Sequence, residues 1–482
     1  MTVPPAERDT YGNVVAGEER VGDETFDVEN PSTEEVVASV SVATDDDVED
    51  ALAAADEAAD EWAAYDPLER SRLLSRVARR LEEAVETLAR TETLEMGRSL
   101  GASTAQAEKT ATYFDYYAGL ADKVEGETIP IDGPSDVLDY TVREPYGVTS
   151  HVVPWNASMV LAVRSIAPAL AAGNTVVAKA DENAPLSLLT LARIAGDAGL
   201  PPGVFNVVTG DGARTGRLIT DDPRVGHVDF TGSTATGTQV MKTAAEHVTP
   251  VHLELGGKSP NVVFPDADLE QAAQDSAKAF WNTGQTCFAP TRIFVHEDVA
   301  GEFVDLLVAE TEAMDVGPGI DGNTVGPLIT AEALERTASY VDEAIANGAE
   351  VLTGGERLDR PGHFYEPTLV TDVDDDAPLS CDEVFGPVLT VSEVGTESEA
   401  VRRANDTDYG LYALVWTENL SRAHRMAREL AAGTVLVNEY LFASQQAPSG
   451  GYKKSGIGRA KGQQAMENYT QLKNVVVSVD EA

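Results

Sequence analysis

The chain contains little cysteine and little positive charge. Its 482 residues include two cysteines, Cys287 and Cys381, and only 35 lysines and arginines against 81 aspartates and glutamates. Two cysteines are too few for a disulfide framework, and in an intracellular protein of this size one reactive thiol is a better explanation than a structural disulfide. We therefore expect a cytoplasmic protein in which one cysteine carries chemistry.

Long apolar runs and metal-binding patterns are also absent from the sequence. No segment approaches the roughly eighteen consecutive apolar residues of a membrane span. The first nine residues include neither a basic nor an apolar region, so we expect no secretory signal. The seven histidines are scattered without zinc-like spacing, and there is no P-loop. The sequence therefore predicts neither a membrane anchor nor a resident metal.

The shortage of positive charge leaves a formal net charge of −46. Such a charge repels nucleic acids and anionic membranes, so neither is expected as a partner. The carboxylates are spread along the chain, with local runs at 45–50 and 372–376, and apolar patterning continues between them. This favours a folded acidic surface over a disordered acidic tail. Because molar salt shortens the Debye length to about 3 Å, we predict a halophilic protein.

The chain is long enough for two or three domains, and 43% of its residues are hydrophobic. Amphipathic patterns predict helices at 45–62, 67–98 and 104–121. From residue 148 onward, strands of four to six residues alternate with helices, which indicates a parallel, doubly wound α/β sheet. The segments of this first run are 148–153, 162–171, 175–179, 185–198, 205–208, 227–230 and 236–246. A second α/β run extends from 259 to about 440 and includes a predicted helix at 269–283.

Two segments of the second half carry reactive side chains beside glycines. Glu254 comes directly before a leucine and a glycine pair, and Cys287 follows Gly-Gln-Thr. A thiolate is the strongest ordinary protein nucleophile, and a nearby carboxylate can activate water. Either segment alone would be explained by a glycine turn or by a buried small residue. Together they predict a catalytic site built on a cysteine and a carboxylate.

Three further motifs have the chemistry of a nucleotide and oxyanion site. Asn156 ends Val-Pro-Trp-Asn after a predicted strand, and its side-chain amide is a neutral donor suited to an oxyanion. Lys179 and Glu182 follow another strand and can hydrogen-bond ribose hydroxyls, although such a pair is usually only solvated. Gly232 to Gly237 leads from a strand into a helix, whose N-terminal N–H groups can bind a pyrophosphate.

These segments resemble motifs of the aldehyde dehydrogenase superfamily. The resemblance rests on Glu-Leu-Gly-Gly-Lys-Ser-Pro at 254–260, Asn-Thr-Gly-Gln-Thr-Cys at 282–287, Gly-Ser-Thr-Ala-Thr-Gly at 232–237 and Glu-Val-Phe-Gly-Pro-Val at 383–388. It implies a Rossmann-like cofactor domain at 1–124 and 148–256, and an α/β catalytic domain at 257–468. It also implies a small β oligomerisation arm at 125–147 and 469–482, and hence a homodimer or homotetramer.

The resemblance implies a role for each motif residue in the oxidation of a small-molecule aldehyde. Cys287 would attack the aldehyde carbon, Asn156 would hold the oxyanion, and Glu254 would activate the water that releases the acid. NAD is the expected cofactor, because Glu182 would repel the 2′-phosphate of NADP. The implied cofactor-binding residues are Val153, Pro154, Trp155, Lys179, Glu182, Gly232, Ser233, Gly237, Leu255, Glu383 and Phe385. An inactive NAD-binding relative and a thioester or ester hydrolase are the alternatives.

The sequence leaves the substrate open between two classes. Arg164 occupies the position where the resembled semialdehyde dehydrogenases hold a distal carboxylate, although it could equally pair with a carboxylate of the protein. Trp281, Phe288 and Phe442 could instead line a pocket for an aromatic or quaternary ammonium group. The first possibility predicts succinic or 2-oxoglutarate semialdehyde as substrate, and the second predicts a betaine or aromatic aldehyde.

Overall fold

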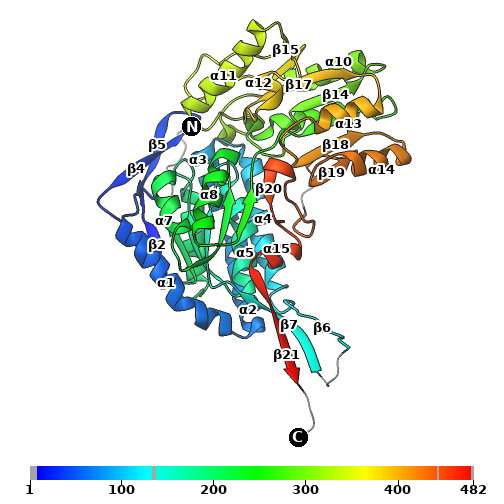
Figure 1. Ribbon diagram of the computed structural model, residues 1–482. Helices are drawn as coiled ribbons and strands as arrows, with labels where there is room; N and C mark the ends of the chain where they lie inside the picture. Colours follow the sequence, from blue (N-terminus) through cyan, green and yellow to red (C-terminus); the bar gives the residue numbers. More distant parts are fainter. Residues whose placement is uncertain (1–7, 133–136, 442–443, 479–482) are drawn as a thin grey trace.

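The computed structural model describes residues 8–132, 137–441 and 444–478, which form two large sheets, their covering helices and a projecting arm (Figure 1). The first large sheet has eight strands in the order β20-β12-β11-β8-β9-β10-β2-β3. Its middle strands, from β12 to β10, are parallel, and β20 and β2 join it antiparallel at either side. The strands are β2 (Asn13–Val15), β3 (Glu18–Arg20), β8 (Val148–Val152), β9 (Thr175–Lys179), β10 (Phe205–Val208), β11 (Val225–Thr231), β12 (Val251–Glu254) and β20 (Gly456–Ile457).

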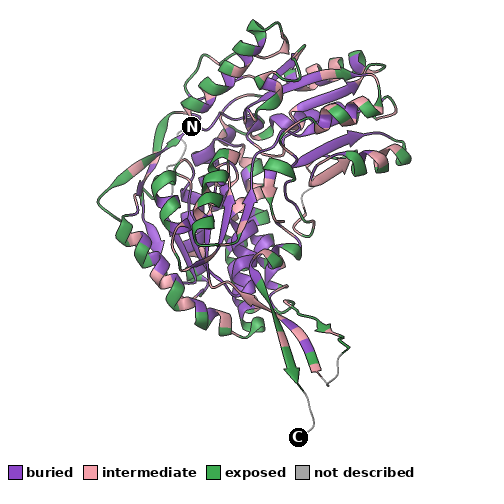
Figure 2. Ribbon diagram, in the orientation of Figure 1, coloured by how far each residue is buried: buried purple, intermediate pink, exposed green. Residues whose placement is uncertain are grey.

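Helices cover both faces of this sheet, as the alternating strands and helices predicted. Val176 and Val177 are neighbours in β9, yet they belong to different hydrophobic clusters because successive strand residues point to opposite faces. The first face packs on α2 (Pro67–Glu83), α4 (Leu100–Ala118), α5 (Ser158–Ala172) and α6 (Leu186–Asp197). The second packs on α1 (Asp45–Ala64), α7 (Arg217–Thr220) and α8 (Thr234–Glu246). Figure 2 shows the strands of this layer as largely buried.

The second large sheet has seven strands in the order β15-β16-β17-β14-β13-β18-β19, all parallel to their neighbours except β15. Its strands are β13 (Pro260–Val263), β14 (Arg292–His296), β15 (Glu350–Thr353), β16 (Thr368–Thr371), β17 (Val388–Val394), β18 (Tyr412–Trp416) and β19 (Thr434–Val437). Its main helices are α9 (Leu269–Ala277), α10 (Ala300–Glu312), α11 (Ala331–Ala346), α13 (Glu397–Asn405) and α14 (Leu420–Glu429). This sheet and its helices occupy the upper part of Figure 1.

Two predicted helices have different boundaries in the structure. The segment 67–98 forms two helices, α2 and α3 (Val85–Met96), because Ala84 leaves the helical region at φ −101° and ψ 6°. The segment 269–283 leaves the α-helix after Ala277 and continues as a tighter 3₁₀ turn. Within that turn Asn282 and Thr283 have φ near +55° to +58°, a region that non-glycine residues seldom adopt.

The arm is a three-stranded antiparallel sheet in the order β21-β7-β6, formed by β6 (Thr128–Ile129), β7 (Val137–Pro145) and β21 (Thr470–Ser478). It extends away from the rest of the protein (Figure 1). Strand β21 is exposed along most of its length, with Leu472 at 60% and Val476 at 57% exposure. Its outer edge has no strand partner among the described residues.

The end of the predicted catalytic domain packs with the first sheet. Residues 456–457, within the segment 257–468 assigned to the catalytic domain, form β20 and pair with β12 of the eight-stranded sheet. Helix α15 (Gln464–Asn468) then packs against α5 of the same layer. The C-terminal part of that segment therefore belongs with the first sheet, since its hydrogen bonds and apolar contacts are made there. Within the described residues, no helix is both long and apolar enough to cross a membrane.

Candidate active site

Cys287 follows the strained turn that ends the α9 segment. Gly284 has φ +69°, and a Cβ at this position would lie 2.1 Å from the carbonyl oxygen of Gly386. A Cβ on Gly257 would likewise lie 2.3 Å from the carbonyl oxygen of Cys287. Both positions therefore require glycine, because no side chain fits between the two backbones. The close approach brings the glycine pair after Glu254 into contact with the loop that carries the thiol.

Cys287, Glu254, Asn156 and Arg164 line one cavity of about 290 Å³. The cavity lies between the two large sheets. Asn156 follows β8 and Glu254 ends β12, both in the eight-stranded sheet, while Cys287 precedes β14 of the seven-stranded sheet. Its wall also contains five aromatic side chains. They are Tyr113, Trp281, Phe288, Tyr412 and Tyr440. The cavity therefore combines a nucleophile, a carboxylate and an amide donor with an apolar wall, a combination suited to small-molecule chemistry.

Asn156 is held in place by residues that the sequence analysis did not identify. Its side-chain Nδ2 donates to the carbonyl of Gln285 at 3.0 Å, and its own carbonyl accepts from Arg98 Nη2 at 2.8 Å. Asn282 Nδ2 also donates to the carbonyl of Asn156 at 3.2 Å. Arg98 is in turn bonded to Asn282 Oδ1 at 3.1 Å. These contacts fix the amide beside the thiol loop and leave its second hydrogen for an oxyanion.

Glu254 is 4% exposed and lies between two positively charged partners. Its Oε2 is 3.7 Å from Arg164 Nη1, and its Oε1 is 3.5 Å from His252 Nε2. Neither Oε1 nor His252 Nε2 has a hydrogen-bond partner in the described residues. Arg164 also donates to Thr231 Oγ1 at 3.2 Å. The side chain of Glu254 is therefore buried and held in place, and its Oε1 forms no hydrogen bond among the described residues.

A buried row of ionisable residues lies behind Glu254. His151 and His252 are the register partners of Asp229 on the two adjacent parallel strands, β8 and β12. His252 Nδ1 lies 2.6 Å from Asp229 Oδ2, which also accepts from Tyr469 at 2.7 Å. Burial alone would lower the pKa of His252, but Asp229, joined by Glu254, raises it to about 9. His252 is therefore an imidazolium at neutral pH, wedged between two carboxylates.

The thiol of Cys287 is strongly affected by its surroundings. Burial raises the pKa of Cys287 to about 12, and the positive charge of Arg164 opposes this rise only in part. The thiol is therefore protonated before substrate enters, and attack on a carbonyl carbon requires an acceptor for its proton. Cys381, by contrast, is exposed and donates to the backbone carbonyl of Asp375.

Several of the predicted cofactor residues lie at the carboxyl ends of β9 and β11, the two strands that flank β8. Lys179 Nζ, at the end of β9, is 2.5 Å from Glu182 Oε2. Ser233 caps α8, whose first N–H groups have no partner within the helix. A Cβ on Gly237 would lie 2.4 Å from Leu255, so this glycine lets the helix approach β12 closely. The carboxyl ends of such strands are where doubly wound sheets bind nucleotides.

The other predicted cofactor residues meet at the boundary with the seven-stranded sheet. Glu383 Oε1 accepts from the N–H of Gly257 at 3.1 Å, and burial raises the pKa of this carboxyl to about 7. Phe385 packs edge-on against Trp155, with ring centroids 5.6 Å apart. Val153 and Pro154 lie directly before Trp155, at the end of β8. Together these elements offer a helix N-terminus, a lysine and two carboxyl groups. This combination of hydrogen-bond donors and acceptors fits a dinucleotide.

The predicted substrate residues differ in their surroundings. Trp281 is 44% exposed, with Lys278 Nζ 5.7 Å from its ring centroid. Phe288 packs against Tyr412 and Tyr440, at centroid distances of 5.1 and 6.1 Å. Both line the cavity. Phe442 lies outside the described residues.

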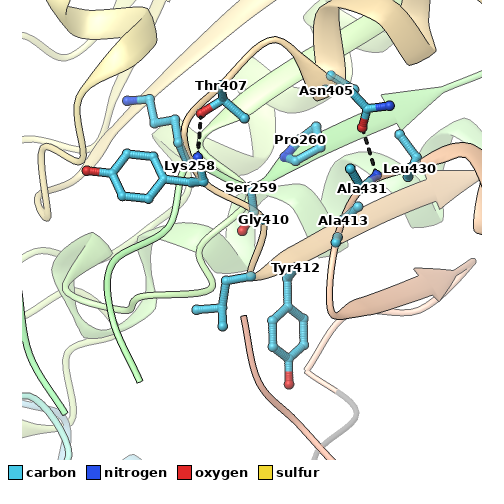
Figure 3. A pocket seen from close by; sticks show the side chains of 14 residues that line it. Lys258, Ser259, Pro260, Asn405, Thr407, Gly410, Tyr412, Ala413, Leu430 and Ala431 are labelled. Atoms are coloured by element: carbon cyan, nitrogen blue, oxygen red, sulfur yellow. Dashed lines mark hydrogen bonds between the residues drawn. The ribbon is translucent and has the colours of Figure 1, made fainter. Parts of the chain in front are cut away.

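A second, much smaller crevice shares Leu411 and Tyr412 with the first cavity (Figure 3). It is lined by Lys258 and by the turn from Asn405 to Leu411, and its volume is about 10 Å³. A cavity of this size holds about one water molecule. Burial, followed by the charge of Arg292, lowers the pKa of Lys258 to about 7. Of the two cavities described, only the one beside Cys287 is therefore large enough for an organic substrate.

The fold and this cavity are those of an α/β enzyme with a nucleotide-type domain, and comparison with known proteins specifies its family. Residues 18–475 match the model of the aldehyde dehydrogenase family. The chain is 39% identical over 460 residues to a hydroxyisobutyraldehyde dehydrogenase from Mycolicibacterium austroafricanum, covering 95% of this chain and 91% of the relative. It is 41% identical over 455 residues to an aldehyde dehydrogenase from Emericella nidulans, covering 94% and 91%.

Solved structures agree with this result. An NAD⁺ complex of an aldehyde dehydrogenase from Bacillus cereus superposes with a TM-score of 0.96 at 40% identity, covering 98% of this chain and 97% of that one. A betaine aldehyde dehydrogenase from Staphylococcus aureus, in complex with NAD⁺, superposes with a TM-score of 0.95 at 37% identity, covering 98% and 95%. The chain belongs to the aldehyde dehydrogenase family, and it is an aldehyde-oxidising enzyme. The expected fold class is confirmed as well.

Proposed function

We propose that the protein oxidises an aldehyde to its carboxylic acid through a thioester on Cys287, with NAD as the electron acceptor. The observation that carries this proposal is the meeting of Cys287, Asn156 and Glu254 in one cavity. The two solved relatives described above bind NAD⁺, and the residues at the ends of β9 and β11 fit a dinucleotide in this chain. The side chain of Glu182, 45% exposed, favours NAD over NADP by like-charge repulsion.

In the first step the sulfur of Cys287 forms a bond to the aldehyde carbon, and the carbonyl oxygen becomes an oxyanion. The thiol loses its proton in this step, and Glu254 Oε1 is the unpartnered base that lines the same cavity. Asn156 Nδ2 and the backbone N–H of Cys287 donate to the oxyanion. NAD, when bound, supplies the acceptor for the hydride that leaves this carbon.

The second step hydrolyses the thioester. Glu254 takes a proton from water, the hydroxide oxygen bonds to the acyl carbon, and the carbon–sulfur bond breaks to release the acid and the thiol. Arg164 and His252 place positive charge 3.7 and 3.5 Å from the two oxygens of Glu254. Arg164 therefore pairs with a carboxyl group of the protein itself. Contact between Arg164 and a substrate carboxylate stays a prediction.

The activity is tested by following NADH formation at high salt with a panel of aldehydes, together with mass spectrometry of the acyl-enzyme. An inactive relative would form no NADH, and a hydrolase would cleave thioesters without NAD. Formation of NADH with an acyl adduct on Cys287 would exclude both alternatives. Adduct formation on another residue would remove Cys287 from the mechanism.

Two further features follow from the exposed surface. The arm, with exposed Leu472 and Val476 beside a free strand edge, supports a homodimer or homotetramer in which β21 pairs with another subunit. The net charge of −46 supports a cytoplasmic protein adapted to molar salt. Its melting temperature should therefore fall on transfer to dilute buffer, and an unchanged melting temperature would contradict the halophilic assignment.

A further inference from the structure

The wall of the substrate cavity has a charge opposite to that of the protein as a whole. Five cationic side chains line it, but among the described lining residues Glu254 is the only carboxylate. The cations are Arg98, Lys109, Arg164, Lys278 and Lys461. The chain contains only ten lysines, so three of the ten stand around this one cavity. An excess of positive charge here is therefore a local feature of the site.

Three of the five cations are already neutralised by the protein. Arg98 pairs with Glu92 at 3.5 Å, Arg164 pairs with Glu254 at 3.7 Å, and Lys278 pairs with Asp275 at 2.5 Å. Lys109 and Lys461 form no ion pair within the described part of the chain, although carboxylates greatly outnumber cations in the sequence. These two lysines are the cations of the cavity whose charge remains for a ligand.

The two free lysines come from different elements of the fold. Lys109 lies on α4, on the same helical face as two other lining residues, Gln106 and Tyr113. Lys461 lies between β20 and α15 and has φ +62°, which only a small fraction of non-glycine residues adopt. Its backbone therefore holds an unusual conformation at a position whose side chain faces the cavity.

The positive charges also act on one another across the cavity. Burial, followed by the charge of Arg164 and, to a smaller extent, that of Lys109, lowers the pKa of Lys461 to about 8. Burial, followed by the charge of Arg98, lowers the pKa of Lys109 as well. The pKa of Lys461 lies above neutral pH, so this side chain is cationic, and an anion in the cavity would relieve the repulsion among the positive charges.

We propose that the cavity selects aldehydes that carry a carboxylate, and that Lys109 and Lys461 are the residues that determine this specificity. The inference rests on the proposed aldehyde oxidation and names its substrate class. It assigns the distal anion to these lysines rather than to Arg164, whose charge is balanced by Glu254. The aromatic wall supplies apolar contacts to the body of the substrate, and the same excess of positive charge opposes a quaternary ammonium aldehyde.

The test compares substrates of equal shape and different charge. 4-Formylbenzoate and 4-formylbenzamide are one such pair, and 4-oxobutanoate and 4-oxobutanamide are an aliphatic pair. At the lowest salt concentration that preserves the circular dichroism spectrum, kcat/KM for each carboxylate should exceed that for its amide by about tenfold or more, chiefly through KM. This preference should shrink as salt is added.

The variants Lys109→Met and Lys461→Met should each lower kcat/KM for the carboxylates by about tenfold and change that for the amides less than twofold. The double variant should lose the preference. Lys123→Met removes the same charge from an exposed site that contacts only Asp122 and the Gly119 carbonyl, so it should keep the preference. Equal kcat/KM for carboxylate and amide in the wild type, or a full preference in the double variant, would overturn the proposal.

Binding to Cys287→Ala, measured by calorimetry, separates this proposal from the proposed function. Tight binding of 4-formylbenzoate without turnover by the wild type would reject the oxidation and retain the anion site. Turnover of both substrates, together with equal affinity for both in Cys287→Ala, would reject the anion site and retain the oxidation.

Discussion

The two large sheets contribute different kinds of group to the active site. The eight-stranded sheet and its helices supply Glu254, Asn156 and Arg164, which are buried and held by several charged or hydrogen-bonded partners. The seven-stranded sheet supplies Cys287, which stands on a loop with residues in left-handed conformations. The side chain of Glu254 is held in position before substrate binds, whereas Cys287 lies on a strained backbone segment. The base and the nucleophile therefore depend on different parts of the fold.

The largest expected effect comes from removing the nucleophile. Cys287→Ala should lower aldehyde oxidation by at least about a thousandfold, because no thioester can form, while NAD binding is retained. Cys381→Ala is the matched control and should leave the rate within twofold, since this thiol is exposed and remote from the cavity lining. Steady-state NADH formation and NAD titration would measure both. Inactivation by the Cys381 change instead would show that the wrong thiol had been assigned.

Changing Glu254, on the opposite sheet, should slow both steps of the reaction. Glu254→Gln should lower turnover about 10²–10⁴-fold without a burst of NADH, because the base is needed for the thiol proton as well as to activate water. A burst of about one NADH per site before slow turnover would show that another group accepts the thiol proton. Stopped-flow absorbance would distinguish these results, and steady-state turnover equal to that of the wild type would exclude Glu254 from the mechanism.

His252 should influence stability in a pH-dependent manner. Its pKa of about 9 lies above the value of 6.5 for a free histidine, so between these pH values the folded protein binds more protons than the unfolded chain. The contribution of His252 is complete below pH 6.5 and is lost as pH rises through 9. Its neighbours His151 and His227, with pKa values lowered by burial to about 4 and 3, destabilise the fold only below pH 6.5.

Accordingly, the stability difference between the wild type and His252→Gln should be largest at pH 6.5 and should shrink towards pH 9. His252→Gln should be the less stable protein at pH 6.5, because Asp229 and Glu254 lose the imidazolium between them. Lys258 and Lys461, whose lowered pKa values act in the opposite direction, contribute equally to both proteins. The exposed His424→Gln is the control and should follow the wild type. Denaturant titrations at constant salt would measure these curves, and parallel curves for wild type and His252→Gln would contradict the assigned protonation state.

The smallest expected effect concerns cofactor choice. Glu182→Ser should narrow the preference for NAD over NADP by roughly fivefold, since a like-charge contact near the surface is worth about 1 kcal/mol. Glu246→Ser, on the exposed end of α8, should leave the ratio unchanged. The ratio of kcat/KM for the two cofactors is the measurement. A wild type that is faster with NADP would refute the role of Glu182.

The sequence by itself determined the doubly wound layers and the family, because strand alternation and motifs such as Glu254-to-Pro260 are local patterns. The glycines beside Cys287 and Glu254 also predicted that these two side chains share one site. The sequence did not predict that the helix expected at 67–98 divides after α2, or that the helix expected at 269–283 ends early at α9. The backbone changes at Ala84 and Trp281 do not alter the spacing of apolar residues on which those predictions rest. The roles assigned to individual site residues remain predictions until the substitutions above are measured.

Only the tertiary structure decided what surrounds these groups. Asp229 faces His252 because two parallel strands are in that register, and Lys109 meets Lys461 because α4 and the segment after β20 enclose the same cavity. Arg164 turns to Glu254, and Arg98 reaches Asn156 from 58 residues away. Such contacts join residues that are distant in the chain, so no spacing encodes them. The balance of charge in the site depends on these long-range pairings, whereas the motifs specify only which reactive groups are present.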